Sequence, residues 1–223
     1  MIRPLVVLRP EPGNTATANR ITEAGFEAIS LPLFAIAAVP WTAPPADDFD
    51  ALLLTSANAV RQAGEGLHTL AELPIVAVGH GTAEAAQQAG LSLAAVGNSD
   101  GKEALALAQA HGWRRVIRLT GREHIHLPGV TDIVVYASDP LDPGAHRIRA
   151  VQDCVVLLHS PRAAQHFSSL VAAAEVARSS IRLAALSQAV TAAAGNGWQQ
   201  VDVAAAPHYP ALVETAMTLA IDR

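Results

Sequence analysis

Cysteine is nearly absent from this chain of 223 residues. The single Cys154 lies in the apolar run from Val151 to Leu158. One cysteine can form neither an internal disulfide nor a zinc site with several thiolates. Because a free cysteine in apolar surroundings behaves as a small hydrophobic residue, we interpret Cys154 as part of the core.

Lysine is just as scarce. Lys102 is the only one, so arginine supplies nearly all of the positive charge, and the formal net charge is -5. This balance argues against a basic face that binds nucleic acid. Arginine suits forked recognition of carboxylates and phosphates. A genome rich in alanine codons and poor in lysine codons gives the same bias, and that is the simpler explanation.

Long hydrophobic runs are missing. No apolar segment reaches the roughly 18 residues that a membrane-spanning helix requires. The first ten residues hold only a short apolar run, followed by charge and proline, which does not resemble a signal peptide. We therefore expect a cytoplasmic protein without a membrane partner. Hydrophobic residues still make up 51% of the chain, which is ample for a core and argues against disorder.

Motifs for nucleotides and metals are absent or incomplete. No Walker A motif and no GxSxG elbow occurs. The segment from Gly79 to Glu84 begins like a dinucleotide fingerprint. However, Glu84 stands at the third small position, where it would obstruct helix packing and repel a pyrophosphate. His124 and His126 resemble half of a metal site, with no cluster of ligands to complete it. We expect no cofactor and no metal.

Short apolar runs alternate with alanine-rich stretches of helical spacing along the whole chain. Fully apolar runs such as Ala51 to Leu54 are typical of strands buried on both faces. Repeated strand-then-helix order predicts an α/β fold in which parallel sheets are flanked by helices. The predicted strands are Leu5 to Leu8, Glu27 to Leu31, Ala51 to Leu54, Ile75 to Val78, Leu93 to Val96, Val116 to Leu119, Ile133 to Tyr136, Val151 to Leu158, Ile181 to Leu186 and Val201 to Ala205.

Two proline-rich segments divide the chain. One holds four prolines between residues 32 and 45, and the other holds Pro140 and Pro143. The segment Leu52 to Ser56 resembles Val156 to Ser160, which indicates two similar halves. We predict two similar domains joined by a two-stranded linker, one of them discontinuous. The predicted limits are 1–34 with 140–223 for the discontinuous domain, 40–133 for the inserted domain, and crossings near 35–39 and 134–139.

Residues with a hydroxyl group, or glycines, stand where several predicted strands end and helices begin. Ligands bind at this edge of a parallel sheet. Backbone N–H groups at helix starts favour anions, and the helix dipole adds to the effect. Ordinary N-capping explains any one of these residues by itself, since serine and threonine are preferred there. The candidates for anion binding are Thr55, Ser56, Gly79, Thr82, Gly121, Ser160 and Ser187.

Several segments, in order along nearly the whole chain, together resemble the uroporphyrinogen-III synthase family. Asp50 to Val60 resembles its most recognisable block, an aspartate and a hydrophobic strand followed by TS-x-x-A-V. Val78 to Ala83 resembles VG-x-x-TA, and Val135-Tyr136 resembles the VY that leads back into the first domain. Ser160-Pro161 resembles the second SP, and Arg9-Pro10 resembles the bacterial opening.

The chain also departs from the family pattern. Ser187 stands where glycine is usual, and Val190 stands where threonine is frequent, although Thr191 is adjacent. His159 replaces the commoner threonine, and the stretch from Thr120 to Tyr136 is shorter than usual. These departures leave open a degenerate member of the family.

The resemblance implies a monomeric hydro-lyase without a cofactor. Its substrate would be hydroxymethylbilane, a linear tetrapyrrole with eight carboxylates, which loses water and closes to uroporphyrinogen III with inversion of the last pyrrole ring. Holding the substrate in one conformation would supply much of the catalysis. By resemblance, Tyr136 would help the hydroxyl group to leave, and Arg9 joins the candidates for substrate binding. On residue type alone, Tyr136 is only a partly buried tyrosine between domains.

Two other classes of function remain as alternatives. A non-catalytic bilobal protein that binds small anions has the same two-domain plan, and domain closure would serve it equally well. Turnover of hydroxymethylbilane distinguishes it from the enzyme. A reductase that uses nicotinamide or flavin is disfavoured by Glu84, and a bound yellow chromophore would identify the flavin case.

Overall fold

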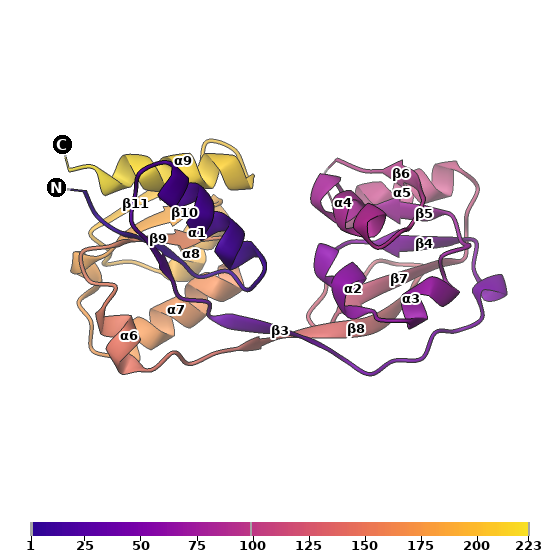
Figure 1. Ribbon diagram of the computed structural model, residues 1–223, viewed down its shortest axis with the longest axis horizontal. Helices are drawn as coiled ribbons and strands as arrows, with labels where there is room; N and C mark the ends of the chain where they lie inside the picture. The colour runs from indigo at the N-terminus through magenta and orange to yellow at the C-terminus, as the bar shows by residue number, and fades with distance from the viewer. Residues whose placement is uncertain (1, 99, 223) are drawn as a thin grey trace. The chain divides into compact units, whose positions relative to one another are not determined.

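The computed structural model describes residues 2–98 and 100–222, and these form two compact units (Figure 1). The first unit consists of the residues up to Ala35 and those from Pro140 onward, and the second unit spans Ile36–Asp139. The predicted limits of the two domains stay a prediction. Among the described residues, no helix has the length and apolar character that a membrane span requires.

The first unit is built on a five-stranded sheet in the order β11-β10-β9-β1-β2. The four strand pairs of this sheet are parallel. Strand β1 pairs with both β2 and β9, so this sheet combines strands from the N-terminal and the C-terminal segments of the first unit. The strands are β1 (Leu5–Val7), β2 (Ala28–Ser30), β9 (Val155–Leu158), β10 (Arg182–Ala185) and β11 (Gln200–Val203).

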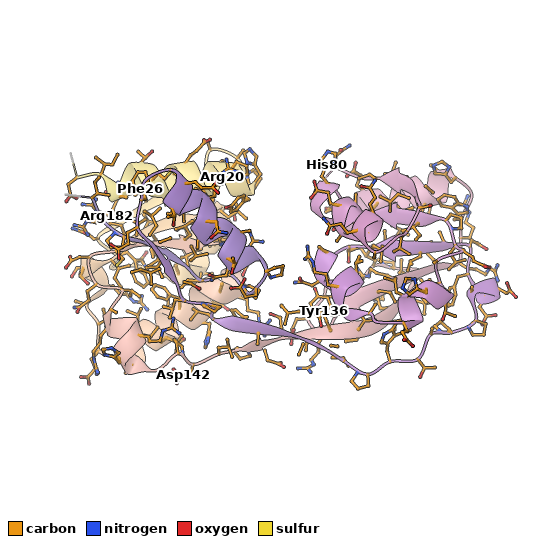
Figure 2. The ribbon with its side chains drawn as sticks, in the orientation of Figure 1. Arg20, Phe26, His80, Tyr136, Asp142 and Arg182 are labelled. Carbon is orange, nitrogen blue, oxygen red and sulfur yellow. The ribbon has the colours of Figure 1, made fainter. Side chains whose placement is uncertain are left out.

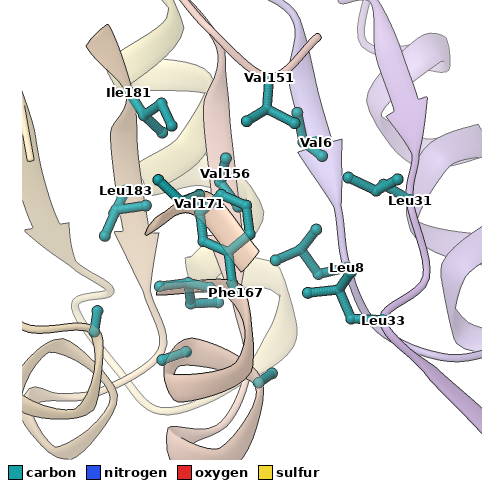
Figure 3. Packing of buried hydrophobic residues seen from close by; sticks show 14 of the residues in the cluster. Val6, Leu8, Leu31, Leu33, Val151, Val156, Phe167, Val171, Ile181 and Leu183 are labelled. Atoms are coloured by element: carbon teal, nitrogen blue, oxygen red, sulfur yellow. The ribbon is translucent and has the colours of Figure 1, made fainter. Parts of the chain in front are cut away.

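Helices cover both faces of this sheet, which explains why its strands β1 and β9 are buried and apolar at every position. On one face Val156 and Leu183 pack with Phe167 of α7, as Figure 3 shows. On the other face Leu157 packs in a second cluster with Leu212 of α9. The helices are α1 (Gly13–Glu23), α6 (Ala145–Arg149), α7 (Pro161–Ala173), α8 (Gln188–Ala194) and α9 (Tyr209–Ala220), with a 3-10 turn at Arg178–Ser180.

The second unit is built on a six-stranded sheet in the order β3-β8-β7-β4-β5-β6. The pairs from β8 to β6 are parallel. The predicted crossings near 35–39 and 134–139 fall within β3 and β8, which are neighbours in this sheet. The strands are β3 (Phe34–Ala38), β4 (Ala51–Leu54), β5 (Ile75–Ala77), β6 (Leu93–Val96), β7 (Val116–Gly121) and β8 (Val130–Pro140).

The two faces of the second sheet are covered differently. Helices α2 (Ala57–Gln62), α3 (Gly66–Thr69) and α4 (His80–Gln88) pack on one face. On the other face lie α5 (Gly101–Ala110) and Leu127. Leu127 belongs to the connection between β7 and β8, residues 122–129, which contains no helix. Parallel neighbours usually need a crossover of about a dozen residues or more, most often a helix, so this connection is unusually short.

Two strands differ from their predicted limits by more than two residues, and a third strand lies where a crossing was predicted. The strand predicted from Val151 to Leu158 begins only at Val155, because the chain turns at residues 151–153, where Asp153 has φ 58°. Strand β8 extends beyond the predicted Ile133 to Tyr136 at both ends. Strand β3 covers most of the first predicted crossing, near 35–39, which the flanking prolines indicated as part of a two-stranded linker.

Candidate active site

A cavity of about 280 Å³ lies in the second unit, at the carboxyl ends of β4 and β7. Thr55 and Ser56, which directly follow β4, contribute to its wall, and so does Thr120 near the end of β7. Tyr136 of β8 and the first residues of α5 also line it. The predicted edge of a parallel sheet therefore brings hydroxyl groups from three strands around one cavity.

Tyr136, which Figure 2 labels, lines this cavity and is held in a defined position. Its hydroxyl group donates a hydrogen bond to Ser56 Oγ over 3.2 Å. Ser56 Oγ in turn accepts a hydrogen bond from the backbone N–H of Asn58 and so caps α2. The ring lies directly on Gly121, where a Cβ atom would be 2.6 Å from Tyr136 Cζ. Only glycine leaves room for the tyrosine ring at this point.

Arg118 is a buried cation in β7 that also lines the cavity, with 3% of its surface exposed. Its Nε donates to Asp132 Oδ1 over 2.6 Å, and Nη2 donates to the carbonyl oxygen of Ile125 over 3.0 Å. The second carboxylate oxygen of Asp132 lies 3.3 Å from His124 Nε2 and 3.6 Å from His126 Nδ1. Burial raises the pKa of Asp132. The hydrogen bond and the charge of Arg118, together with the two histidines, lower this pKa by more than burial raises it, so the pKa lies below its usual value.

A family model described as uroporphyrinogen-III synthase HemD matches residues 15–214. The chain belongs to the uroporphyrinogen-III synthase family. The resemblance inferred from the ordered motifs is thus confirmed. The assignment of this protein to tetrapyrrole biosynthesis is confirmed with it. A search of curated protein sequences finds no match.

Solved structures of the family have the same fold. Uroporphyrinogen-III synthetase from Helicobacter pylori is 16% identical, with a TM-score of 0.66, and the match covers 98% of this chain and 100% of that one. A mutant uroporphyrinogen III synthase from Thermus thermophilus, described as an extremely thermophilic bacterium, is 18% identical, with a TM-score of 0.54 and 98% of each chain covered. The predicted α/β class with two parallel sheets flanked by helices is therefore confirmed.

Two predicted residues of the second unit, Gly79 and Thr82, lie outside this cavity. Gly79 precedes α4 with a φ of +112°, a backbone conformation that favours glycine. Thr82 lies in the first turn of α4. Neither residue is part of the cavity wall. Within residues 2–98 and 100–222, no group of three or more His, Cys, Asp or Glu residues is arranged to hold a metal ion.

The first unit also has polar residues at the carboxyl edge of its sheet. Ser160 caps α7, since its Oγ accepts a hydrogen bond from Ala163 N over 3.2 Å. Ser187 precedes α8 without a side-chain cap. Arg9, two residues after β1, has its guanidinium carbon 5.5 Å from the centre of the Tyr209 ring, and Arg20 of α1 lies 5.7 Å from the same centre. Both distances are within the range of cation–π contacts.

His159 is an uncharged histidine at the same edge. Its ring stacks on Tyr209 with the ring centres 6.4 Å apart. Among the described residues, neither ring nitrogen has a hydrogen-bond partner. Burial and the nearby charge of Arg9 lower the pKa of His159 to about 4. The side chain is therefore neutral at pH 7 and unsuited to bind an anion by charge.

The sequence did not single out Arg118 or Tyr209. Arg118 carried a usable signal, because it is a charged residue inside a strand predicted to be buried. Such a residue is rarely buried without a partner or a role. Tyr209 is an ordinary residue type for a helix start, so only the folded chain reveals its position.

Proposed function

We propose that this chain is a hydro-lyase that converts hydroxymethylbilane into uroporphyrinogen III, with loss of water and inversion of the last pyrrole ring. The observation that carries the proposal is the Tyr136 hydroxyl group, which lines the cavity and is oriented by Ser56. The family resemblance assigns to this tyrosine the task of helping the substrate hydroxyl to leave.

In the proposed reaction, the Tyr136 hydroxyl group turns its proton away from Ser56 Oγ and donates it, or a strong hydrogen bond, to the hydroxymethyl oxygen as the bond from that oxygen to carbon breaks. The oxygen leaves as water, and the pyrrole nitrogen stabilises the resulting azafulvene cation. The substituted carbon of the last ring then attacks this cation to give a spiro intermediate. That intermediate opens and closes again as the asymmetric ring, and the proton that is released restores the phenol.

Substrate positioning completes the proposal. Carboxylates are well held by backbone N–H groups and hydroxyls at the starts of helices, so few catalytic side chains are needed. We also propose that the protein acts as a cytoplasmic monomer that does not bind nucleic acid. Light scattering after size-exclusion chromatography tests the monomeric state. The proposed substrate contacts are Arg9, Thr55, Ser56, Gly79, Thr82, Gly121, Ser160 and Ser187.

The proposed activity is tested by a coupled assay that starts from porphobilinogen and separates the two ring isomers. We expect isomer III to be the main product when this protein is present. Isomer I alone, the product of unaided closure, would show that the protein is not a synthase. Tight binding of hydroxymethylbilane without turnover would instead favour the non-catalytic anion-binding protein.

Replacing Tyr136 by phenylalanine removes only the hydroxyl oxygen, so we expect an unchanged melting temperature. General acid catalysis is typically worth about 10²–10⁴-fold in rate. We expect the loss in the rate of isomer III formation to be at or below the lower end, because the leaving group also departs unaided. A Tyr136→Ala variant, compared for both melting temperature and rate, separates catalysis from packing. A phenylalanine variant with the wild-type rate would exclude Tyr136 from the reaction.

Thr55→Ala and Thr82→Ala are each expected to lower kcat/KM. A hydrogen bond to a charged group is worth about 1.5–3 kcal/mol, and we expect the lower value, roughly a tenfold loss. His126→Ala is the control and should leave kcat/KM nearly unchanged, because the side chain of His126 is 73% exposed and lies outside the cavity wall. Silent threonine variants beside an inactive His126→Ala variant would show that the assignment of the substrate contacts is wrong.

Exhaustive chelation is expected to leave the activity unchanged, as is the omission of nucleotides. The reason is chemical, since loss of water from the substrate and attack on the cation involve no net oxidation and need only a proton donor. Isomer III formation before and after dialysis against a chelator measures this. Activity that is lost and then restored by one particular metal would contradict the expectation.

A further inference from the structure

Arg118 occupies a position where an arginine is costly. It lies on β7, between β8 and β4, and all six residues of this strand are buried. A buried cation needs both a counter-ion and a full set of hydrogen-bond acceptors to offset its loss of hydration. Asp132, on the neighbouring strand β8, supplies the counter-ion.

The acceptors of Arg118 are incomplete. Its Nε is bound to Asp132 and its Nη2 to the carbonyl oxygen of Ile125. In the part of the chain that the structure describes, Nη1 has no acceptor, although Arg118 lines the cavity. A Cβ atom at Gly101 would lie 3.9 Å from Nη1. The free end of the guanidinium group therefore lies beside the first residue of α5, at the cavity.

A purely structural role accounts for only part of this arrangement. The β7–β8 connection has no helix, and the bond from Nη2 to Ile125 holds this loop over the sheet. That role needs Nε and Nη2, and it leaves Nη1 unexplained. An apolar side chain at the same position would also pack the loop without the cost of a buried charge.

The other groups around the cavity favour an anion. Thr55 and Thr120 supply hydroxyl groups, and Lys102 adds a second cation. Of the acidic residues in the wall, Asp100 is engaged, because its Oδ1 accepts from the N–H groups at the start of α5. Glu123 is exposed on the loop. The cavity of about 280 Å³ lies at the lower limit of ligand sites, so it fits one side chain rather than a whole tetrapyrrole.

We propose that Arg118 determines substrate specificity by binding one carboxylate side chain of the linear tetrapyrrole through Nη1. This inference rests on the proposed function. A guanidinium group is suited to carboxylates, and Asp132 fixes its plane with Nη1 beside Gly101 of the cavity wall. The carboxylate belongs to an acetate or to a propionate group of the substrate.

The test compares Arg118→Gln with the wild type in hydroxymethylbilane turnover and in binding of the oxidised product, uroporphyrin III. We expect KM and the uroporphyrin Kd to rise about 10- to 100-fold, the loss of one hydrogen bond to a charged group. Arg118→Lys should recover part of the affinity. Coproporphyrin III, which has methyl groups in place of the acetates, separates the two sources, since its affinity falls in Arg118→Gln only if a propionate is bound.

Two further variants make the test independent of folding. Arg115→Gln removes an exposed arginine of the same unit, paired with Asp50 away from the cavity, and should leave KM unchanged. The double variant Arg118→Leu with Asp132→Leu removes the whole ion pair, so no charge is left buried alone, and should show the same rise in KM as Arg118→Gln. Wild-type KM in this double variant, with a shift of melting temperature only, would overturn the proposal.

The inference and the proposed function fail in different ways. Isomer III formation that is unaffected by Arg118→Gln in KM and in porphyrin affinity would overturn the role of Arg118 alone. Absence of turnover in the wild type, together with uroporphyrin binding that depends on Arg118, would overturn the enzyme and leave the carboxylate site standing. Porphyrin binding that is equal in all variants would overturn the carboxylate site.

Discussion

Replacing Gly121 by alanine is expected to lower the rate of isomer III formation by up to about 10²-fold, as much as removal of the Tyr136 hydroxyl group. The added Cβ atom would lie 2.6 Å from Tyr136 Cζ and 2.9 Å from its hydroxyl oxygen. Such distances force the ring to move, so the hydrogen bond from Tyr136 to Ser56 is lost as well. Overpacking of this kind typically costs about 1–3 kcal/mol of unfolding free energy.

The collision with Tyr136 can be isolated by a second substitution. In a Tyr136→Ala background the added methyl group meets no ring, so Gly121→Ala should have almost no further effect on stability. The matched control is Gly81→Ala, because nothing lies within 4 Å of a Cβ atom at this helical position. This control should be neutral, or stabilising by about 0.5–1 kcal/mol. A fully active Gly121→Ala variant would show that the position of the tyrosine ring does not limit the reaction.

Replacing His159 by leucine is expected to remove a loss of stability at low pH. The pKa of His159 is about 4 in the folded chain and about 6.5 in an unfolded chain. As the pH falls below about 6.5, the unfolded chain gains a proton that the folded chain does not bind. Stability is therefore lost between about pH 6.5 and pH 4, by up to about 3 kcal/mol, and this contribution is constant outside that window.

Denaturant unfolding of the wild type and of the His159→Leu variant at several pH values from 7 to 4 measures this loss of stability. Carboxylates titrate in the same window in both chains, so the difference between the two proteins reports His159. A His126→Leu variant is the control, since the side chain of His126 is 73% exposed and should show no comparable change. Stability curves of the wild type and the His159→Leu variant that run parallel across the window would contradict a buried, neutral His159.

The sequence was sufficient for the fold because each element carried its own local signal. Runs such as Ala51–Leu54 are apolar at every position, and a turn with a hydroxyl group or glycine follows them, so strand, edge and helix start could be predicted together. Thr55 and Ser56 were selected in this way, Tyr136 was selected by the family resemblance, and the structure brings all three to one cavity.

The rest of the site depends on pairing between strands, for which the sequence has no local signal. Gly121 and Tyr136 meet because their strands pair in register, with an irregularity after Thr120. Arg118 reaches Asp132 for the same reason, as direct partners on adjacent strands. A one-residue change of register would send each side chain to the opposite face, and the spacing of residues in the sequence does not fix that register.

The strand pairing in the first unit has a consequence for synthesis on the ribosome. Strand β1 pairs with β9, so the pair of Leu5 with Val155 can form only after β9 has been synthesised. The second unit, Ile36–Asp139, draws all its partners from one continuous stretch of chain. Long-range pairing is slow because the intervening loop must close first. The second unit can therefore fold while β1 is still unpaired with β9. Until β9 is synthesised, the apolar β1 is exposed to aggregation.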